Sequence, residues 1–261
     1  MFDFHMHTVV SFDGHDTGLD MALAAREKGL KAICFTDHMD YDPLVENQTM
    51  TFDFDDYRAQ YDDLDVPGLK ICRGMEFGLT VDNRPLLEAC LRKRHFDFLL
   101  GSVHFADGVD VYYAPYWEGK SIFQAERVYL EQTLKCVQLH DNFDVLAHLS
   151  YVSKARAHPT NANLRYDDHR ELLNEILRTL AQKGKGLEIN TSGIDRCGGF
   201  LPDVSFFRRF KEFGGEIVTI GSDAHNCQRV GQYADRACAV LKDIFGHVCT
   251  FEGRKPIFHK L

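Results

Sequence analysis

The stretch FDFHMHTVVSFDGH, residues 2–15, joins a short apolar segment to an unusual density of ligand-type side chains. His5 and His7 stand two positions apart at the end of the apolar segment, and Asp13 and His15 follow in the next loop. Side chains two apart on a strand point to the same face, so His5 and His7 can present both imidazoles to one centre. If residues 2–5 begin a sheet, other strands of that sheet should end in a similar way.

Apolar and β-branched segments alternate with helical patterns along the rest of the chain, which indicates an α/β fold. The predicted strands are residues 2–5, 31–38, 69–77, 97–104, 144–149, 186–191 and 216–222. Most are followed by a helical pattern, so a parallel sheet is expected. The clearest helix lies within residues 167–186, where one face carries Leu172, Leu173, Ile176, Leu177 and Leu180. Gly184 and Gly186 are expected to end it.

Composition predicts one globular domain over residues 1–261. The chain is 44% hydrophobic and 26% charged, which is enough apolar material for a large core. No Pro/Gly/Ser-rich linker, low-complexity tract or repeat divides it. Residues 40–67 are acidic and aromatic-rich, and are predicted to form an inserted loop with a short helix.

The formal net charge of −9 argues against a broad surface for nucleic acid, although a small anionic ligand needs only a local cationic pocket. The sequence contains neither an apolar run of membrane-spanning length nor a signal peptide, so we expect a cytoplasmic protein without a membrane partner. The eight cysteines are scattered and form no C-x-x-C pair. They are expected to be reduced thiols rather than a zinc framework.

Residues of metal-binding type recur at the ends of the predicted strands. They are His5, His7, His38, Glu76, His104, His148, Asp223 and His225. In a parallel (β/α) barrel the C-terminal ends of the strands meet on one face, where active sites are assembled from several strands. Imidazole suits zinc, iron and manganese, and a carboxylate such as Glu76 can bridge two cations. One strand-end histidine is usually structural, but this recurrence predicts a metal cluster.

The remaining candidates need separate treatment. Asp13 is the preferred ligand from the loop after the first strand, whereas His15 could be a ligand, orient a ligand or contact a substrate. The other histidines lie in polar helical, loop or tail contexts and are expected to be structural: His95, His140, His158, His169, His247 and His259.

Six short motifs together resemble the successive metal motifs of the PHP (polymerase and histidinol phosphatase) family: HMHT…SFDGH, FTDH, GMEFG, GSVH, AHLS and GSDAH. The resemblance runs from Phe2 to about His225, in the order that the family shows. It implies a distorted (β/α)7 TIM-like barrel with a di- or trinuclear cluster of zinc, iron or manganese at the C-terminal ends of the strands.

The resemblance also implies how the ligands divide. His5, His7, Glu76 and Asp223 would hold a first metal; Glu76, His104 and His148 a second; and Asp13, His38 and His225 a third. The family often has histidine where Asp13 stands. The catalytic groups would then be Asp13, Glu76, Asp223 and His225.

Chain length and the run LEINTSGIDR resemble the histidinol-phosphatase branch, which implies hydrolysis of L-histidinol phosphate in histidine biosynthesis. A metal-activated hydroxide would attack phosphorus. By the same resemblance, Arg196 and Arg156 would bind the phosphate, with His15 as a further substrate contact, since guanidinium can contact phosphate oxygens in pairs. A metal-bound water, Asp13 or His15 could donate a proton to the leaving group. An acidic loop, Asp40, Asp42 and Glu46, could meet the histidinol amine.

Two other interpretations remain open. A PHP phosphoesterase could act on a nucleotide or another small phosphate ester, although the sequence shows no basic, aromatic-lined groove for a long nucleic acid. A barrel that binds metals without catalysis would be expected to lack some ligands, and none is plainly missing.

Overall fold

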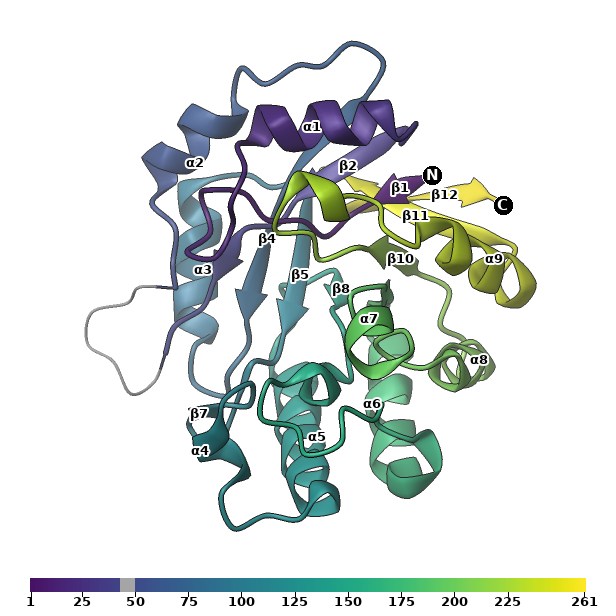
Figure 1. Cartoon of the computed structure of the whole chain (residues 1–261). Coiled ribbons are helices and arrows are strands. Elements are labelled where there is room, and N and C mark those ends of the chain that lie inside the picture. Colours follow the sequence, from purple (N-terminus) through teal and green to yellow (C-terminus); the bar gives the residue numbers. More distant parts are fainter. Residues whose placement is uncertain (43–49) are drawn as a thin grey trace.

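The computed structural model describes residues 1–42 and 50–261, and its central feature is a ring of parallel strands (Figure 1). Hydrogen-bonded pairing orders the ring as β1 (Phe2–Asp3), β2 (Ala32–Phe35), β4 (Lys70–Gly78), β5 (Phe98–Ser102), β8 (Val145–Leu146), β9 (Gly186–Asn190) and β10 (Val218–Gly221). The short β3 (His38–Met39) pairs with the end of β4. The seven predicted strands are confirmed, and the fold is the predicted distorted (β/α)7 barrel.

Bonds between the two ends of the chain bring the ring close to full closure. The backbone N–H of Asp223 donates to the carbonyl of His5 over 2.8 Å. The buried carboxylate of Asp3, on β1, accepts the backbone N–H of Ser222 over 2.9 Å. The first and last strands are therefore joined at the level where His5 and Asp223 leave them.

The α-helices of the described residues lie outside the ring of strands (Figure 1). They are α1 (Gly18–Glu27), α2 (Phe54–Tyr61), α3 (Arg84–Lys93), α4 (Ala114–Trp117), α5 (Ile122–Leu139), α6 (Arg170–Gln182), α7 (Gly193–Cys197), α8 (Val204–Glu212) and α9 (Ala234–Ile244). Helix α6 buries Leu173, Ile176, Leu177 and Leu180, as its spacing predicts. Gly184, with a φ of 64°, ends it.

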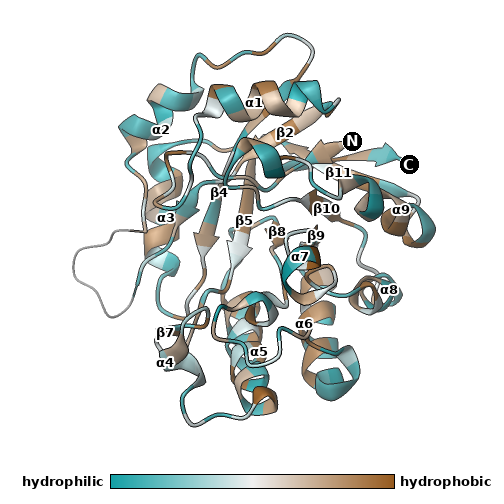
Figure 2. Cartoon of the chain, in the orientation of Figure 1, coloured by the Kyte–Doolittle hydropathy of each residue, from teal (hydrophilic) through white to brown (hydrophobic). Residues whose placement is uncertain are grey.

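Apolar side chains fill the inside of the ring, and a C-terminal hairpin covers its far end. The strands are largely brown in Figure 2, which marks hydrophobic residues. Phe4, Phe98 and Leu100 pack inside the ring with Phe251 of the hairpin formed by β11 (His247–Glu252) and β12 (Lys255–Lys260). The prediction of loop or tail for the segment with His247 and His259 is therefore wrong, because pairing and burial of β11 order it as a hairpin.

Two smaller features complete the frame. Residues 40–67 contain the predicted short helix, α2, whose Tyr57 and Tyr61 are buried against the barrel, whereas Glu46 lies outside the described residues. All eight cysteines fall within the described residues and are free thiols, as predicted. Among the described helices, none has both the length and the apolar character needed to cross a bilayer.

Candidate metal centre

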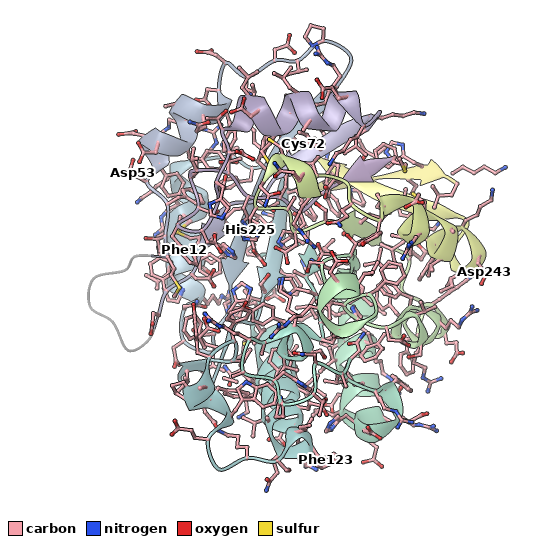
Figure 3. All side chains as sticks on the ribbon, viewed as in Figure 1. Phe12, Asp53, Cys72, Phe123, His225 and Asp243 are labelled. Carbon is pink, nitrogen blue, oxygen red and sulfur yellow. The ribbon has the colours of Figure 1, made fainter. Side chains whose placement is uncertain are left out.

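A pocket of about 330 Å³ lies where the C-terminal ends of the strands meet. Its walls include His38, His104 and His148 from different strand ends, and His225 and Phe12 from the loops beyond the last and first strands. Figure 3 labels Phe12 and His225, which lie near each other on this side of the barrel. The face that the strand pattern predicts for the site therefore carries a real cavity.

Glu76, at the end of β4, is the centre of the ligand array. Its side chain is fully buried, and five imidazoles place a ring nitrogen within 3.5 Å of one of its oxygens. These rings belong to His5, His7, His38, His104 and His148. Oε2 faces the first three and Oε1 the last two, so the carboxylate lies between two groups of ligands.

The predicted first group is compact. The Nε2 atoms of His5 and His7 are 3.1 Å apart and lie 3.7 and 3.5 Å from Oδ1 of Asp223. Asp223 has a φ of 55°, in the left-handed region that Asp tolerates better than most residues. This backbone turn follows β10 directly and points the Asp223 carboxylate at the two imidazoles from β1.

The predicted second and third groups flank the first. Oε1 of Glu76 lies 2.9 Å from Nε2 of His148 and 3.5 Å from Nε2 of His104. On the other side, Oδ2 of Asp13 lies 3.1 Å from Nε2 of His225 and 3.8 Å from Nε2 of His38. The structure thus brings together all nine residues that the sequence predicts as ligands.

The carboxylates and imidazoles of the cluster shift one another's pKa values. Neighbouring carboxylates outweigh burial and raise the pKa of His5 and of His104 well above the usual value, and that of His38 to about 9. Burial alone would raise the pKa of Glu76, but the neighbouring imidazoles, His5 foremost, hold that pKa well below its usual range. Burial, reinforced by His38 and His225, lowers the pKa of His7 to about 3. At neutral pH the cluster therefore combines a buried anion with a neutral imidazole whose lone pair is available.

The donor set fits divalent transition metals. Several buried polar atoms of the cluster have no hydrogen-bond partner, namely Glu76 Oε2, Asp13 Oδ1 and His148 Nδ1. Four triads of the described residues have ligand atoms within 4.8 Å of one another: His5/His7/Asp223, His5/Glu76/His148, His7/His38/His225 and His38/Asp40/His104. Imidazole nitrogen with carboxylate oxygen is the ligand mixture that zinc, iron and manganese accept.

Buried side chains form hydrogen bonds to the Nδ1 atoms of two ligand imidazoles. The sequence analysis missed these supporting side chains. Glu188, on β9, accepts a hydrogen bond from Nδ1 of His5 over 2.7 Å. The hydroxyl of Ser11 lies 3.2 Å from Nδ1 of His7 and donates to Asp37 over 2.9 Å. In both histidines Nδ1 therefore carries the proton, which leaves the Nε2 lone pair for the cluster. A buried acid within an apolar strand, as in LEIN, is the signal that could have revealed Glu188.

Glu188→Gln is expected to lower cation affinity by about 10- to 100-fold, because the amide accepts less strongly from His5 and no longer fixes its ring. Titration of metal-stripped protein with zinc against a competing chelator measures this affinity. Asp195→Asn, on the exposed face of α7, serves as the matched control and should leave the affinity unchanged. Wild-type affinity in Glu188→Gln would show that Glu188 does not support the centre.

Lys154 is the functional cation that the sequence analysis missed. It ends the 3-10 helix η1 (Tyr151–Lys154), lines the pocket, and donates to Oδ2 of Asp223 and, over 3.1 Å, to the hydroxyl of Ser192. Burial lowers the pKa of Lys154, but Asp223 outweighs this effect and raises it. Lys154 is therefore charged at neutral pH, and it precedes the predicted Arg156 by only two positions.

The three predicted substrate contacts lie outside the pocket lining. Arg156, Arg196 and His15 are exposed, and none of them lines the pocket. The Arg196 guanidinium donates to the backbone carbonyls of Ala155 and Arg156, each over 3.2 Å. Arg196, on α7, thus contacts the segment that follows Lys154 and carries Arg156. The roles of the two arginines, like that of His15, stay predictions.

Asp40 does not lie in a solvent-exposed acidic loop. Rather than facing solvent in an acidic loop, it is buried, with Oδ1 2.8 Å from Nδ1 of His104 and Oδ2 3.0 Å from Nδ1 of His38. Each oxygen accepts from one of these histidines, and Asp40 also lines the pocket, so its role in meeting a substrate amine stays a prediction. The six histidines predicted to be structural do not line the pocket.

Comparison with known proteins gives a consistent result. The family model described as "PHP domain" matches residues 3–192. The chain is 30% identical to a histidinol-phosphatase from Lactococcus lactis over 97% of this chain and 95% of the relative. It is also 29% identical to a protein of Clostridium acetobutylicum named "Probable histidinol-phosphatase", over 88% of this chain and 89% of that one.

The fold also matches the solved structure of a histidinol phosphate phosphatase. The crystal structure of histidinol phosphate phosphatase from Lactococcus lactis, complexed with zinc, L-histidinol and phosphate, superposes with a TM-score of 0.85. The match covers 98% of each chain at 28% sequence identity.

Proposed function

Because this chain belongs to the PHP domain family, we propose that it hydrolyses a phosphate monoester, L-histidinol phosphate, to L-histidinol and phosphate. The observation that carries this proposal is the buried Glu76 carboxylate with five imidazoles around it, three of which, His38, His104 and His148, line a pocket large enough for a small ligand. A relative with 28% identity and the same fold binds zinc, L-histidinol and phosphate. The reaction belongs to histidine biosynthesis.

We assign three cation sites, whose donors accept zinc, iron or manganese. The first site is formed by His5, His7, Glu76 and Asp223; the second site by Glu76, His104 and His148; and the third site by Asp13, His38 and His225. When bound, such cations lower the pKa of a water to about 7 and stabilise charge that develops on phosphate. Glu76 is the residue shared by the first and second sites.

Lys154 is assigned to the phosphate. Its ammonium is the only lysine or arginine group among the described residues that line the pocket, and it lies beside Asp223 of the first site. A charged ammonium in a partly buried position attracts a phosphate dianion more strongly than it would in water. Lys154 therefore orients the ester next to the cations, and Arg156 and Arg196 are proposed to reach the phosphate from the adjacent segment.

Asp13 is assigned as a ligand rather than as the acid for the leaving group. Burial raises the pKa of Asp13, but His225 and His38 outweigh it and hold the pKa well below its usual range. Asp13 is therefore ionised at neutral pH and has no proton to donate.

The outer part of the pocket suits the organic half of the ester. Asp110, at the end of β7 (Val109–Asp110), lines the pocket and accepts the backbone N–H of Tyr112 over 2.8 Å. Phe12 and Tyr113 line the same mouth although their side chains are 55% and 52% exposed. A carboxylate beside exposed aromatic rings matches an ammonium next to a planar imidazole.

Asp110→Asn is expected to raise the KM for L-histidinol phosphate by about tenfold or more, because the amide keeps the bond to Tyr112 but loses the charge that attracts the amine. Steady-state kinetics with glycerol phosphate, which has no amine, provide the control. The KM for that ester should not change. An equal effect on both esters would mean that Asp110 acts on the pocket in general and not on the amine.

The proposed reaction is tested by phosphate release from a panel of monoesters, with protein reconstituted in zinc or manganese. L-histidinol phosphate should give the highest kcat/KM, above mononucleotides and a short 3′-phosphorylated oligonucleotide. Preference for a nucleotide would move the protein to another phosphoesterase activity, and no turnover with any ester would leave a barrel that only binds metals. A biosynthetic phosphatase with eight free thiols is further proposed to work in the cytoplasm.

A further inference from the structure

We propose that Asp40 is a positioning residue that couples the second and third cation sites, because its single carboxylate orients one imidazole of each. The inference rests on the proposed metal sites and adds a residue that belongs to none of them. Asp40 follows β3 and is 2% exposed. Its Oδ1 lies 2.8 Å from Nδ1 of His104, a ligand of the second site, and its Oδ2 lies 3.0 Å from Nδ1 of His38, a ligand of the third.

The two hydrogen bonds fix which nitrogen of each ring faces the cations. An ionised carboxylate can only accept, so Nδ1 must carry the proton in both His38 and His104. The lone pairs are then on Nε2, which lies 3.5 Å from Glu76 Oε1 in His104 and 3.8 Å from Asp13 Oδ2 in His38. Nδ1 of His38 also lies 3.1 Å from Glu76 Oε2, so its proton lies between the carboxylates of Asp40 and Glu76. Each Nε2 atom thus faces another ligand of its own site, as in other metal centres where a carboxylate holds a ligand imidazole.

The surrounding backbone leaves room for this carboxylate and for little else. Gly78, the last residue of β4, has no side chain, and a Cβ there would lie 1.8 Å from Oδ1 of Asp40. The side chains of His38, Asp40 and His104 are close enough together to hold a metal ion between them. The distances from Asp40 to the two imidazoles are, however, those of direct hydrogen bonds. The geometry therefore identifies Asp40 as a shared support of two sites.

The expected consequence is joint loading. When a cation at the second site fixes the His104 ring, the Asp40 carboxylate is fixed as well, and His38 is already oriented for the third site. Asp40→Asn breaks this link, because the amide has one acceptor and one donor. Only one ring can keep its proton on Nδ1, and the other must turn a protonated Nε2 toward its cation site.

The test is a titration of metal-stripped protein with Co²⁺, with bound metal counted by mass spectrometry and the visible absorption of cobalt reporting the ligand set. In the wild type the second and third cations should bind in one cooperative step. Asp40→Asn should weaken both, by about 10- to 100-fold, and separate the steps. Gly78→Ala leaves Asp40 itself unchanged, but the added methyl group displaces the Asp40 carboxylate. This variant should therefore give the same result.

Asp110→Asn is the matched control for metal content, since Asp110 lines the same pocket without contacting a histidine in any described hydrogen bond. Wild-type stoichiometry and cooperativity in both Asp40→Asn and Gly78→Ala would overturn the proposal. So would the loss of one cation with the other unaffected, which would tie Asp40 to one site. Phosphate release by the wild type is scored separately, so a failure of the proposed reaction does not decide the role of Asp40.

Discussion

Glu76→Gln is expected to lower kcat for the proposed phosphatase by about 10³-fold or more and to reduce bound metal by at least one ion per chain. Glu76 is the one carboxylate that faces both groups of imidazoles, His5, His7 and His38 on Oε2 and His104 and His148 on Oε1. The amide removes a buried negative charge and turns an NH2 group toward ring nitrogens that should donate electron pairs. Both the affinity for cations and the stabilisation of charge on phosphate depend on that anion.

Metal analysis and steady-state kinetics on the same preparation measure the two effects together. The matched control is Glu126→Gln on α5, because Glu126 is also a buried glutamate with a histidine partner, His169, at 3.0 Å. It lies away from the pocket and should keep wild-type metal content and turnover. If Glu76→Gln also retained both, the assignment of the metal centre would be wrong.

Lys154→Met is expected to lower kcat/KM by about 10²-fold, with weaker inhibition by inorganic phosphate. The substitution keeps the length of an apolar side chain but removes the ammonium that lies between Asp223 and the pocket. The phosphate dianion loses a fixed positive partner, and Asp223 loses a hydrogen-bond donor on the oxygen that faces away from the histidines. The kinetic constants and the inhibition constant for phosphate are the measurements.

Two further variants separate charge from structure. Lys154→Arg keeps the positive charge and should recover part of the activity. Lys120→Met removes another partly buried lysine, which is paired with Asp107 and stacked on Tyr116 outside the pocket, and should change neither constant. Unchanged phosphate inhibition in Lys154→Met would show that another group binds the phosphate.

The barrel and the clustering of the ligand-type residues could be predicted from the sequence because both depend on local patterns. A strand such as residues 98–102 has an apolar sequence, and the position of His104 just beyond its end follows from the direction of the strand. The hairpin of β11 and β12 was missed for a physical reason. Its outer strand carries Pro256 and lysines at both ends, so its order comes from pairing with β11 and from the packing of Phe251 under the barrel, not from its own composition.

The supporting residues of the site could not be predicted in the same way. Asp40, Lys154 and Glu188 act through partners that are distant in sequence, and their hydrogen bonds exist only once the strands are side by side. The sequence analysis instead favoured Arg156 and Arg196, whose positions follow the motif but whose side chains are exposed. Motifs locate ligands well, whereas the groups that orient them need coordinates.

The closure of the ring has a consequence for synthesis of the protein in the cell. Asp3 and Ser222, whose bond joins the first and last strands, are 219 residues apart, so His5 and Asp223 meet only after the chain between them has left the ribosome. Contacts between such distant segments form late in folding, since the entropy of a very long loop must be lost first. A nascent chain cannot hold the cation proposed for the first site until this last step. Binding of that ion therefore shows that the ring of strands has closed.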